Sequence, residues 1–163
     1  MKIDLHCHTK QIKSGDGEKR NVTPEVFREK ISNADIGIVA ITNHNAFDYE
    51  QYIALRDAVS DICAVWPGVE IDIQGSNGKK FHLIVVANPE RAQDFSVGVS
   101  ELFRGMNLET CKLDLQQVYD KLNEFDVVFC YFSKNSEMML MLIFLMSQNL
   151  AWVTLISIQI FVR

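Results

Sequence analysis

The sequence lacks the patterns that mark several common protein classes. Its cysteines form no C-x-x-C pair, no Gly-x-x-x-x-Gly-Lys-Ser/Thr loop is present, and no apolar leader precedes the first apolar run. We therefore expect free, mostly buried thiols in a reducing, cytoplasmic compartment, and no ATP-binding P-loop within these residues. The cysteines are Cys7, Cys63, Cys111 and Cys130.

The chain also lacks an excess of positive charge. Its 163 residues carry a formal net charge of -5, with 48% hydrophobic and 23% charged residues. This composition is typical of a soluble globular domain and gives no general electrostatic footprint for nucleic acid. A local basic stretch, Lys10, Lys13, Lys19 and Arg20, is more often a solvated loop, but beside a metal site it could meet a phosphate.

Histidine is scarce, and two of the four histidines stand close together at the start of the chain. His6 and His8 follow a short apolar run, and alternate side chains of a strand share a face. Two imidazoles on one face can bind one metal ion. Ordinary surface or packing histidines are the competing interpretation at this point.

The rest of the chain alternates strand-like and helix-like segments, which predicts an α/β fold. Thr23 followed by Pro24 is a typical helix start. Gly75 to Gly78 is a turn signal that predicts a hairpin. Strands are expected over residues 36–42, 63–73 (interrupted at Pro67-Gly68), 81–87 and 126–131, and helices over 23–35, 48–59, 89–103 and 114–125.

Other candidate ligands lie at the ends or faces of these strands. His44 ends the second strand, Glu70 shares a face of the third with Asp72, and His82 lies early in the fourth. Ligands at the carboxyl ends of α/β strands converge, and a hairpin can bring His82 back beside Glu70. A carboxylate between Val69 and Ile71 is costly to bury alone, so we expect Glu70 to meet a cation.

Each of the other candidates also has a plainer interpretation. His44 could be a loop histidine, His82 a core histidine, and Asp16 a turn residue within Gly15-Asp16-Gly17. Their joint pattern is more informative, because no histidine falls in an expected helix.

Four motifs in order resemble those of the PHP (polymerase and histidinol phosphatase) family. The resemblance covers about residues 1–135, and two of its segments, residues 39–45 and 65–70, are similar to PHP domains at the N-terminus of AAA-like ATPases. It implies the N-terminal part of a distorted (β/α)7, TIM-like barrel of a metal-dependent hydrolase. The motifs are His6-x-His8, Thr42-Asn43-His44-Asn45, Gly68-Val69-Glu70-Ile71-Asp72 and Phe81-His82-Leu83.

The resemblance also implies ligand roles and a reaction. His6 and His8 would bind a first metal, Glu70 would bridge to a second that also takes His82, and His44 with Asp16 would serve a third. Zinc, manganese or iron would fit, up to three ions in all. The implied reaction is hydrolysis of a phosphoester by metal-bound hydroxide. Implied partners are a phosphorylated small molecule or a nucleic-acid end as substrate, and an ATPase domain in a full-length relative.

The chain departs from the family pattern in its second half. No histidine follows His82, and Tyr131 stands close to where related domains carry one. Each implied metal position therefore lacks at least one ligand. This leaves a catalytically impaired PHP remnant or regulatory domain as an alternative. A TatD-like metal-dependent DNase, which also opens with His-x-His, is a weaker alternative that residues 42–45 and 68–70 disfavour.

The C-terminal segment is unlike the rest of the chain. No charged residue occurs from Met138 to Val162. Three accounts compete: a transmembrane anchor, buried strands or helices of the barrel, or a sequence altered by a frameshift and early stop. We favour the third, and not a membrane partner, because the composition changes where the resemblance fades. We therefore divide the chain into a partial PHP domain, 1–136, and an apolar tail, 137–163.

Overall fold

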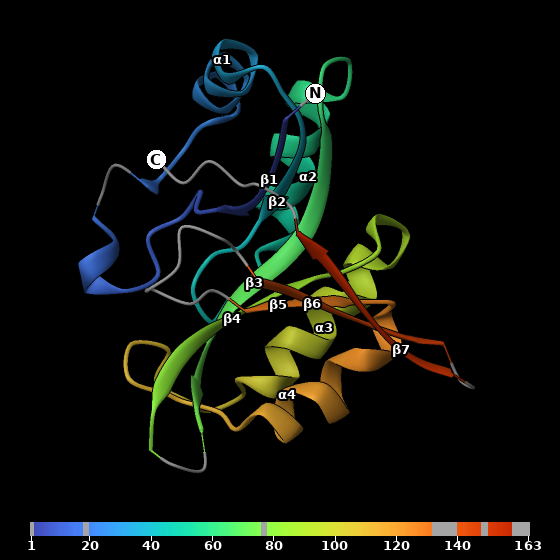
Figure 1. Cartoon of the computed structure of the whole chain (residues 1–163). Coiled ribbons are helices and arrows are strands. Elements are labelled where there is room, and N and C mark those ends of the chain that lie inside the picture. The colour runs from blue at the N-terminus through green and yellow to red at the C-terminus, as the bar shows by residue number, and fades with distance from the viewer. Residues whose placement is uncertain (1, 18–19, 76–77, 132–139, 148–149, 158–163) are drawn as a thin grey trace.

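The computed structural model describes residues 2–17, 20–75, 78–131, 140–147 and 150–157, with side chains as far as residue 130 (Figure 1). Its main feature is a curled five-stranded sheet in the order β1-β2-β3-β4-β5. The first three strands are parallel, and β4 and β5 are antiparallel to their neighbours. The strands are β1 (Lys2–Cys7), β2 (Ile36–Ile41), β3 (Ala64–Gln74), β4 (Lys80–Val86) and β5 (Val128–Tyr131).

Three of the four α-helices begin at a residue whose side chain caps the helix. Thr23 caps α1 by accepting from Val26 N at 3.4 Å, and Asp48 caps α2 by accepting from Gln51 N at 3.0 Å. The helices are α1 (Pro24–Ala34), α2 (Tyr49–Val59), α3 (Ala92–Leu102) and α4 (Leu115–Leu122). The longest have 11 residues, and no helix in the described ranges is long and apolar enough to cross a membrane.

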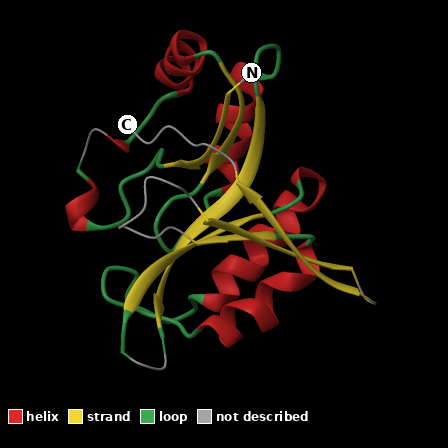
Figure 2. Cartoon of the chain, in the orientation of Figure 1, coloured by secondary structure: helices red, strands yellow, loops and turns green. Residues whose placement is uncertain are grey.

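Helices and sheet share one main core. Side chains of all four helices pack with alternate residues of β2, β3 and β4 in a single apolar cluster, which includes Tyr52, Leu55, Ile71 and Phe95. The other sheet face has a smaller cluster around Ile84 and Cys130. Figure 2 shows the helices set against the sheet. The fold is thus mixed α/β, consistent with part of a TIM-like barrel; the full (β/α)7 arrangement stays an expectation.

The expected break in the third strand at Pro67-Gly68 is wrong. β3 runs without interruption, because this dipeptide lies where the strand changes partners: Pro67 ends the parallel pairing with β2, and Gly68 begins the antiparallel pairing with β4. The Pro67 carbonyl accepts from Ala87 N at 2.9 Å. Pro67 therefore lies at the end of the ladder with β4, where its missing N–H removes only a terminal hydrogen bond.

Two α-helices, α3 and α4, are shorter than the helical segments expected from the sequence. Residues 89–103 begin with a 3-10 turn, η3 (Pro89–Arg91), and residues 114–125 end with another, η4 (Asn123–Phe125). A third 3-10 turn, η1 (Ser14–Asp16), lies in the loop after β1. The hairpin turn at residues 76–77 lies outside the described residues.

In the apolar tail the structure describes two strands. β6 (Leu140–Ser147) and β7 (Leu150–Ser157) pair in an antiparallel two-stranded sheet. The division of the chain at residue 136 falls outside the described residues and stays a prediction. All four cysteines are free, as expected; Cys63 and Cys130 are buried, whereas Cys7 and Cys111 are only partly buried.

Candidate metal centre

Glu70 is the centre of the candidate site. It lies in β3 between Val69 and Ile71, and only 1% of its surface is exposed. The chain that leaves β2 continues alongside β3, because Glu70 N donates to Asn43 O at 3.0 Å and Asn45 N donates to Glu70 O at 2.7 Å. This extension of the parallel pairing places His44 directly beside Glu70.

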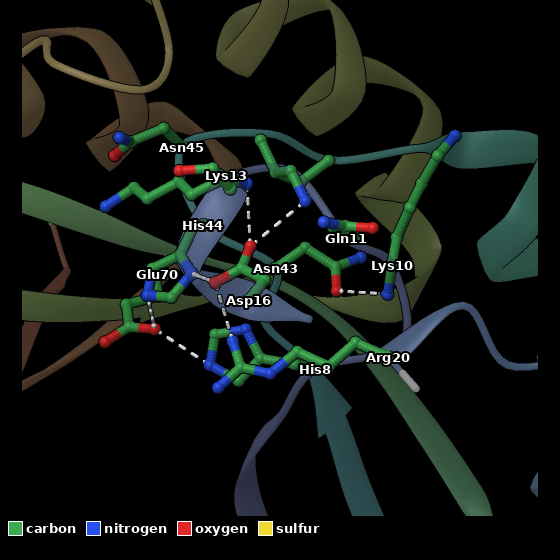
Figure 3. Close-up of polar contacts among 12 residues, drawn as sticks. His8, Lys10, Gln11, Lys13, Asp16, Arg20, Asn43, His44, Asn45 and Glu70 are labelled. Carbon is green, nitrogen blue, oxygen red and sulfur yellow. Dashed lines mark hydrogen bonds and ion pairs between the residues drawn. The ribbon is translucent and has the colours of Figure 1, made fainter. Parts of the chain in front are cut away.

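All four histidines of the chain surround the Glu70 carboxylate. Its Oε2 atom lies 3.1 Å from Nε2 of His6, 2.9 Å from Nε2 of His8 and 2.9 Å from Nε2 of His44. His82 contacts the other oxygen, Oε1, through Nδ1. Figure 3 shows His8 and His44 turned towards Glu70. The histidines that the sequence scatters over 77 positions, from 6 to 82, thus meet at one carboxylate.

The donor atoms are arranged as metal ligands are. Two sets, His6-His8-Glu70 and His44-Glu70-His82, each have one ligand atom per residue, all within 4.8 Å of one another. Nε2 of His6 and Nε2 of His8 are 2.9 Å apart. Imidazole nitrogens and a carboxylate are the ligands preferred by zinc, iron and manganese. The residues present therefore fit a divalent cation at either set.

Asp16 lies beyond His44, on the side of the imidazole ring opposite Glu70. Its Oδ1 atom is 2.7 Å from Nδ1 of His44 and 2.8 Å from Nη1 of Arg20. Its Oδ2 atom accepts from the backbone N–H groups of Ile12 and Lys13, at 3.0 and 2.8 Å. Asp16 faces a different nitrogen of His44 from the one that faces Glu70, so it does not join either of the two ligand sets.

Asp72 forms a second carboxylate beside His82. Its Oδ1 atom is 3.3 Å from Nε2 of His82, while its Oδ2 atom contacts Nζ of Lys13 and accepts from Asn45 Nδ2 at 3.0 Å. His82 thus stands between Glu70 and Asp72. The sequence placed Asp72 on the face of Glu70, but nothing in it indicated Lys13 as the partner.

Asn43 holds the chain that follows His8. Its Oδ1 atom accepts from Thr9 N at 2.8 Å and from Lys10 N at 3.0 Å. Gln51 of α2 supports the same segment by donating to Thr9 O at 2.9 Å. The sequence did not reveal that Asn43 and Gln51 position this segment. An asparagine after a strand is an ordinary turn residue, and nothing in the sequence indicates which residues it contacts.

The contacts shift the pKa values of the site in opposite directions. Burial raises the pKa of Glu70, but the contacts with His44, His6, His8 and His82 outweigh burial and hold it below its usual value. Burial lowers the pKa of His8, and Glu70 only partly opposes this. Contact with Glu70 raises the pKa of His82, against burial. At neutral pH an ionised Glu70 therefore meets a neutral His8, the protonation states that metal ligation needs.

The fold matches that of a known structure. It resembles a presumed metal-dependent phosphoesterase from Bifidobacterium adolescentis, with a TM-score of 0.53 and 15% sequence identity, over 85% of this chain and 70% of that one. No protein-family model matches the chain, and no curated protein does. At this identity the likeness shows the fold alone. The candidate site rests on the geometry of this chain's own residues.

One departure from the family pattern can be placed on the fold. Tyr131 ends β5 and pairs with Leu83, the residue after His82. It therefore lies at the end of β5, next to the part of β4 that carries His82. The segment after it, residues 132–139, lies outside the described residues.

Proposed function

We propose that this chain is a metal-dependent phosphoesterase of the PHP type. One observation carries the proposal: a buried carboxylate, Glu70, is surrounded by every histidine of the chain. A carboxylate this deeply buried is costly unless its charge is matched. Bound cations would complete the balance. The fold of the presumed phosphoesterase agrees with this proposal.

Each ligand set would hold one cation, and Glu70 would bridge the two. His6 and His8 would hold one ion, and His44 with His82 the other. Bound at such a site, divalent cations supply an activated water and polarise a phosphoryl oxygen. The protein's part is to fix the ligands: Asn43 anchors the chain after His8, and the Glu70 backbone anchors the chain around His44. We propose a phosphorylated small molecule or a nucleic-acid end as substrate, and an ATPase region as partner in a longer protein.

The proposal is tested by metal content and hydrolysis in one preparation. We expect purified protein to retain manganese, zinc or iron after dialysis, and to hydrolyse p-nitrophenyl phosphate when loaded with manganese. The His6→Ala and Glu70→Ala variants should lose both properties. Glu101→Ala is a matched control, because Glu101 pairs with Lys121 and Arg104 on the surface, away from the histidines. Metal-free protein that remains inactive with added manganese would overturn the proposal.

The lack of a histidine after His82 supports a second candidate function. The family pattern needs further ligands after His82, and the chain has no histidine there. A catalytically impaired domain would bind metal through His6, His8 and Glu70 without hydrolysing any phosphoester. Metal retention that is lost in His6→Ala, with no turnover of p-nitrophenyl phosphate by the wild-type chain, would favour this regulatory or remnant role.

A further inference from the structure

A glutamate from a distant segment holds the loop that carries Asp16. Glu109 lies between α3 and α4, and both of its carboxylate oxygens contact Ser14, the first residue of η1. Its Oε2 atom accepts from Ser14 N at 2.8 Å, and its Oε1 atom accepts from the Ser14 hydroxyl at 2.7 Å. Hydrogen bonds to an ionised carboxylate are stronger than neutral ones, and two of them fix an orientation. Ser14 is therefore held at two points although it is exposed.

The turn that Glu109 holds has little packing of its own. Gly15 and Gly17 flank Asp16, and a Cβ at either glycine would meet nothing within 4 Å. Gly17 also has a φ of 75°, which an L side chain rarely adopts. Within the turn, Asp16 N donates to Lys13 O at 3.0 Å. The place of Asp16 therefore depends on polar contacts such as the one that Glu109 makes.

Glu109 itself stands on an anchored segment. Its N–H group donates to Asn107 Oδ1 at 2.9 Å. The carbonyl of its neighbour Leu108 accepts from Asn45 Nδ2 at 3.0 Å, and Leu113 forms a parallel bridge to β3. This segment thus connects the loop after β1 with β3 and with the chain between β2 and α2, and those two parts of the chain supply ligands to the candidate centre.

The charges around Glu109 show what its contacts have to overcome. The two hydrogen bonds from Ser14 hold the pKa of Glu109 below its usual value; Lys13 adds to this, whereas Asp16 opposes it. Glu109 is therefore ionised at neutral pH and lies near a second carboxylate that repels it. The contacts with Ser14 keep the two carboxylates in place despite this repulsion.

We propose that Glu109 is a positioning residue of the metal centre. Through Ser14 it fixes the turn that presents Asp16. Asp16 Oδ1 then lies 2.7 Å from Nδ1 of His44, and Nε2 of the same ring faces Glu70 (Figure 3). A carboxylate behind a ligating imidazole sets the orientation of the ring and strengthens it as a ligand. The consequence for metal binding rests on the function proposed above, whereas the positioning of the loop does not require a metal.

A double-mutant cycle on manganese affinity tests whether Glu109 acts through Asp16. In calorimetric titrations of the full chain, Glu109→Ala should weaken manganese binding about 5-fold, because it disturbs an outer partner of a ligating histidine. Glu109→Gln can still accept from Ser14 N and should restore most of the affinity. In the Asp16→Asn background, Glu109→Ala should add little, since its route to the metal is already lost. Glu101→Ala is the matched control, because it removes another exposed glutamate with two partners.

Amide hydrogen exchange of the chelated protein measures the positioning without metal. Ile12 N and Lys13 N both donate to Asp16 Oδ2. Their exchange should be faster in Glu109→Ala than in the wild type, and Glu109→Gln should again resemble the wild type. Urea unfolding of the same samples distinguishes this local opening from a loss of global stability.

The outcomes separate this proposal from the proposed function. Unchanged exchange at Ile12 and Lys13, or an equal loss of manganese affinity in both backgrounds, would overturn the role of Glu109. Wild-type protein that binds no manganese would contradict the proposed function. In that case the exchange of the chelated protein still decides the positioning role: faster exchange in Glu109→Ala supports it, and unchanged exchange refutes it.

Discussion

Asp16 Oδ1 lies 2.7 Å from Nδ1 of His44, and this nitrogen is buried. A carboxylate oxygen at this distance can accept a hydrogen bond from Nδ1 and so orient the imidazole, with Nε2 facing Glu70. Arg20 donates to the same oxygen at 2.8 Å and so balances the charge of Asp16. A cation at this position would have to compete with Arg20.

The two oxygens of Asp16 can be tested separately. In Asp16→Asn an oxygen remains to accept from Ile12 N and Lys13 N, but the charge beside His44 is lost. We expect manganese affinity to fall about 10-fold, as for loss of an outer partner of a metal-binding histidine. The thermal midpoint should fall less than in Asp16→Ala, because only the ion pair with Arg20 is lost. Asp16→Ala should lower both. Calorimetric titration and circular dichroism measure the two effects. Unchanged manganese affinity in Asp16→Asn would show that Asp16 serves the loop alone.

Asn45 combines an unusual backbone conformation with three side-chain hydrogen bonds. Its φ is 50°, and its amide bonds to Asp72 Oδ2, Asp72 N and Leu108 O, each at 3.0 Å. Asn45→Gly keeps the left-handed backbone accessible and should cost about 2–3 kcal/mol through the lost bonds. Asn45→Ala should cost about 1 kcal/mol more, because alanine is strained at positive φ. Urea unfolding of the two variants measures the difference, and equal stabilities would refute the strain argument.

The parts of the fold that could be predicted are those set by local pattern. Thr23, Pro24 and Asp48 mark helix starts wherever they occur before an amphipathic run, and α1 and α2 begin as expected. The meeting of His44 with Glu70 also follows from general rules, because parallel strands end at one edge of a sheet. The hairpin predicted from the turn residues is also present, and it places His82 in the strand next to Glu70.

The parts that could not be predicted depend on how loops return to the sheet. Lys13 meets Asp72 across 59 positions, and Lys112 flanks β3 opposite Lys80, and no local pattern encodes either approach. Pro67 is a strand breaker by local rules, and its position at the end of the ladder with β4 makes it acceptable. Contacts of this kind, which loops make with the sheet, can therefore be identified only from the structure.

Gly68 is expected to tolerate no side chain. A Cβ there would lie 2.8 Å from Thr42 Cγ2 and 2.9 Å from the carbonyl oxygen of Val85. Backbone cannot move away cheaply in the middle of a sheet, so Gly68→Ala should destabilise the protein by about 1–3 kcal/mol. Gly15→Ala is the matched control, because a Cβ at Gly15 meets nothing within 4 Å. Urea midpoints that shift equally in the two variants would contradict the crowding at Gly68.

Cys130 should make the stability of the protein fall at alkaline pH. The thiol is fully buried, packed near Ile84 and Val86, and burial raises its pKa from 9.0 to about 12. Because the folded pKa is the higher one, the contribution of the neutral thiol is complete below pH 9 and is lost as pH rises towards 12. The loss amounts to about 1.4 kcal/mol per pH unit in that window.

The Cys130→Ala variant lacks this loss. Cys7, whose pKa burial also raises to about 12, is present in both proteins, so its contribution cancels. Urea unfolding at pH 8, 9.5 and 10.5 should therefore show the wild-type free energy of unfolding falling more steeply than that of Cys130→Ala; parallel pH curves would refute the assignment.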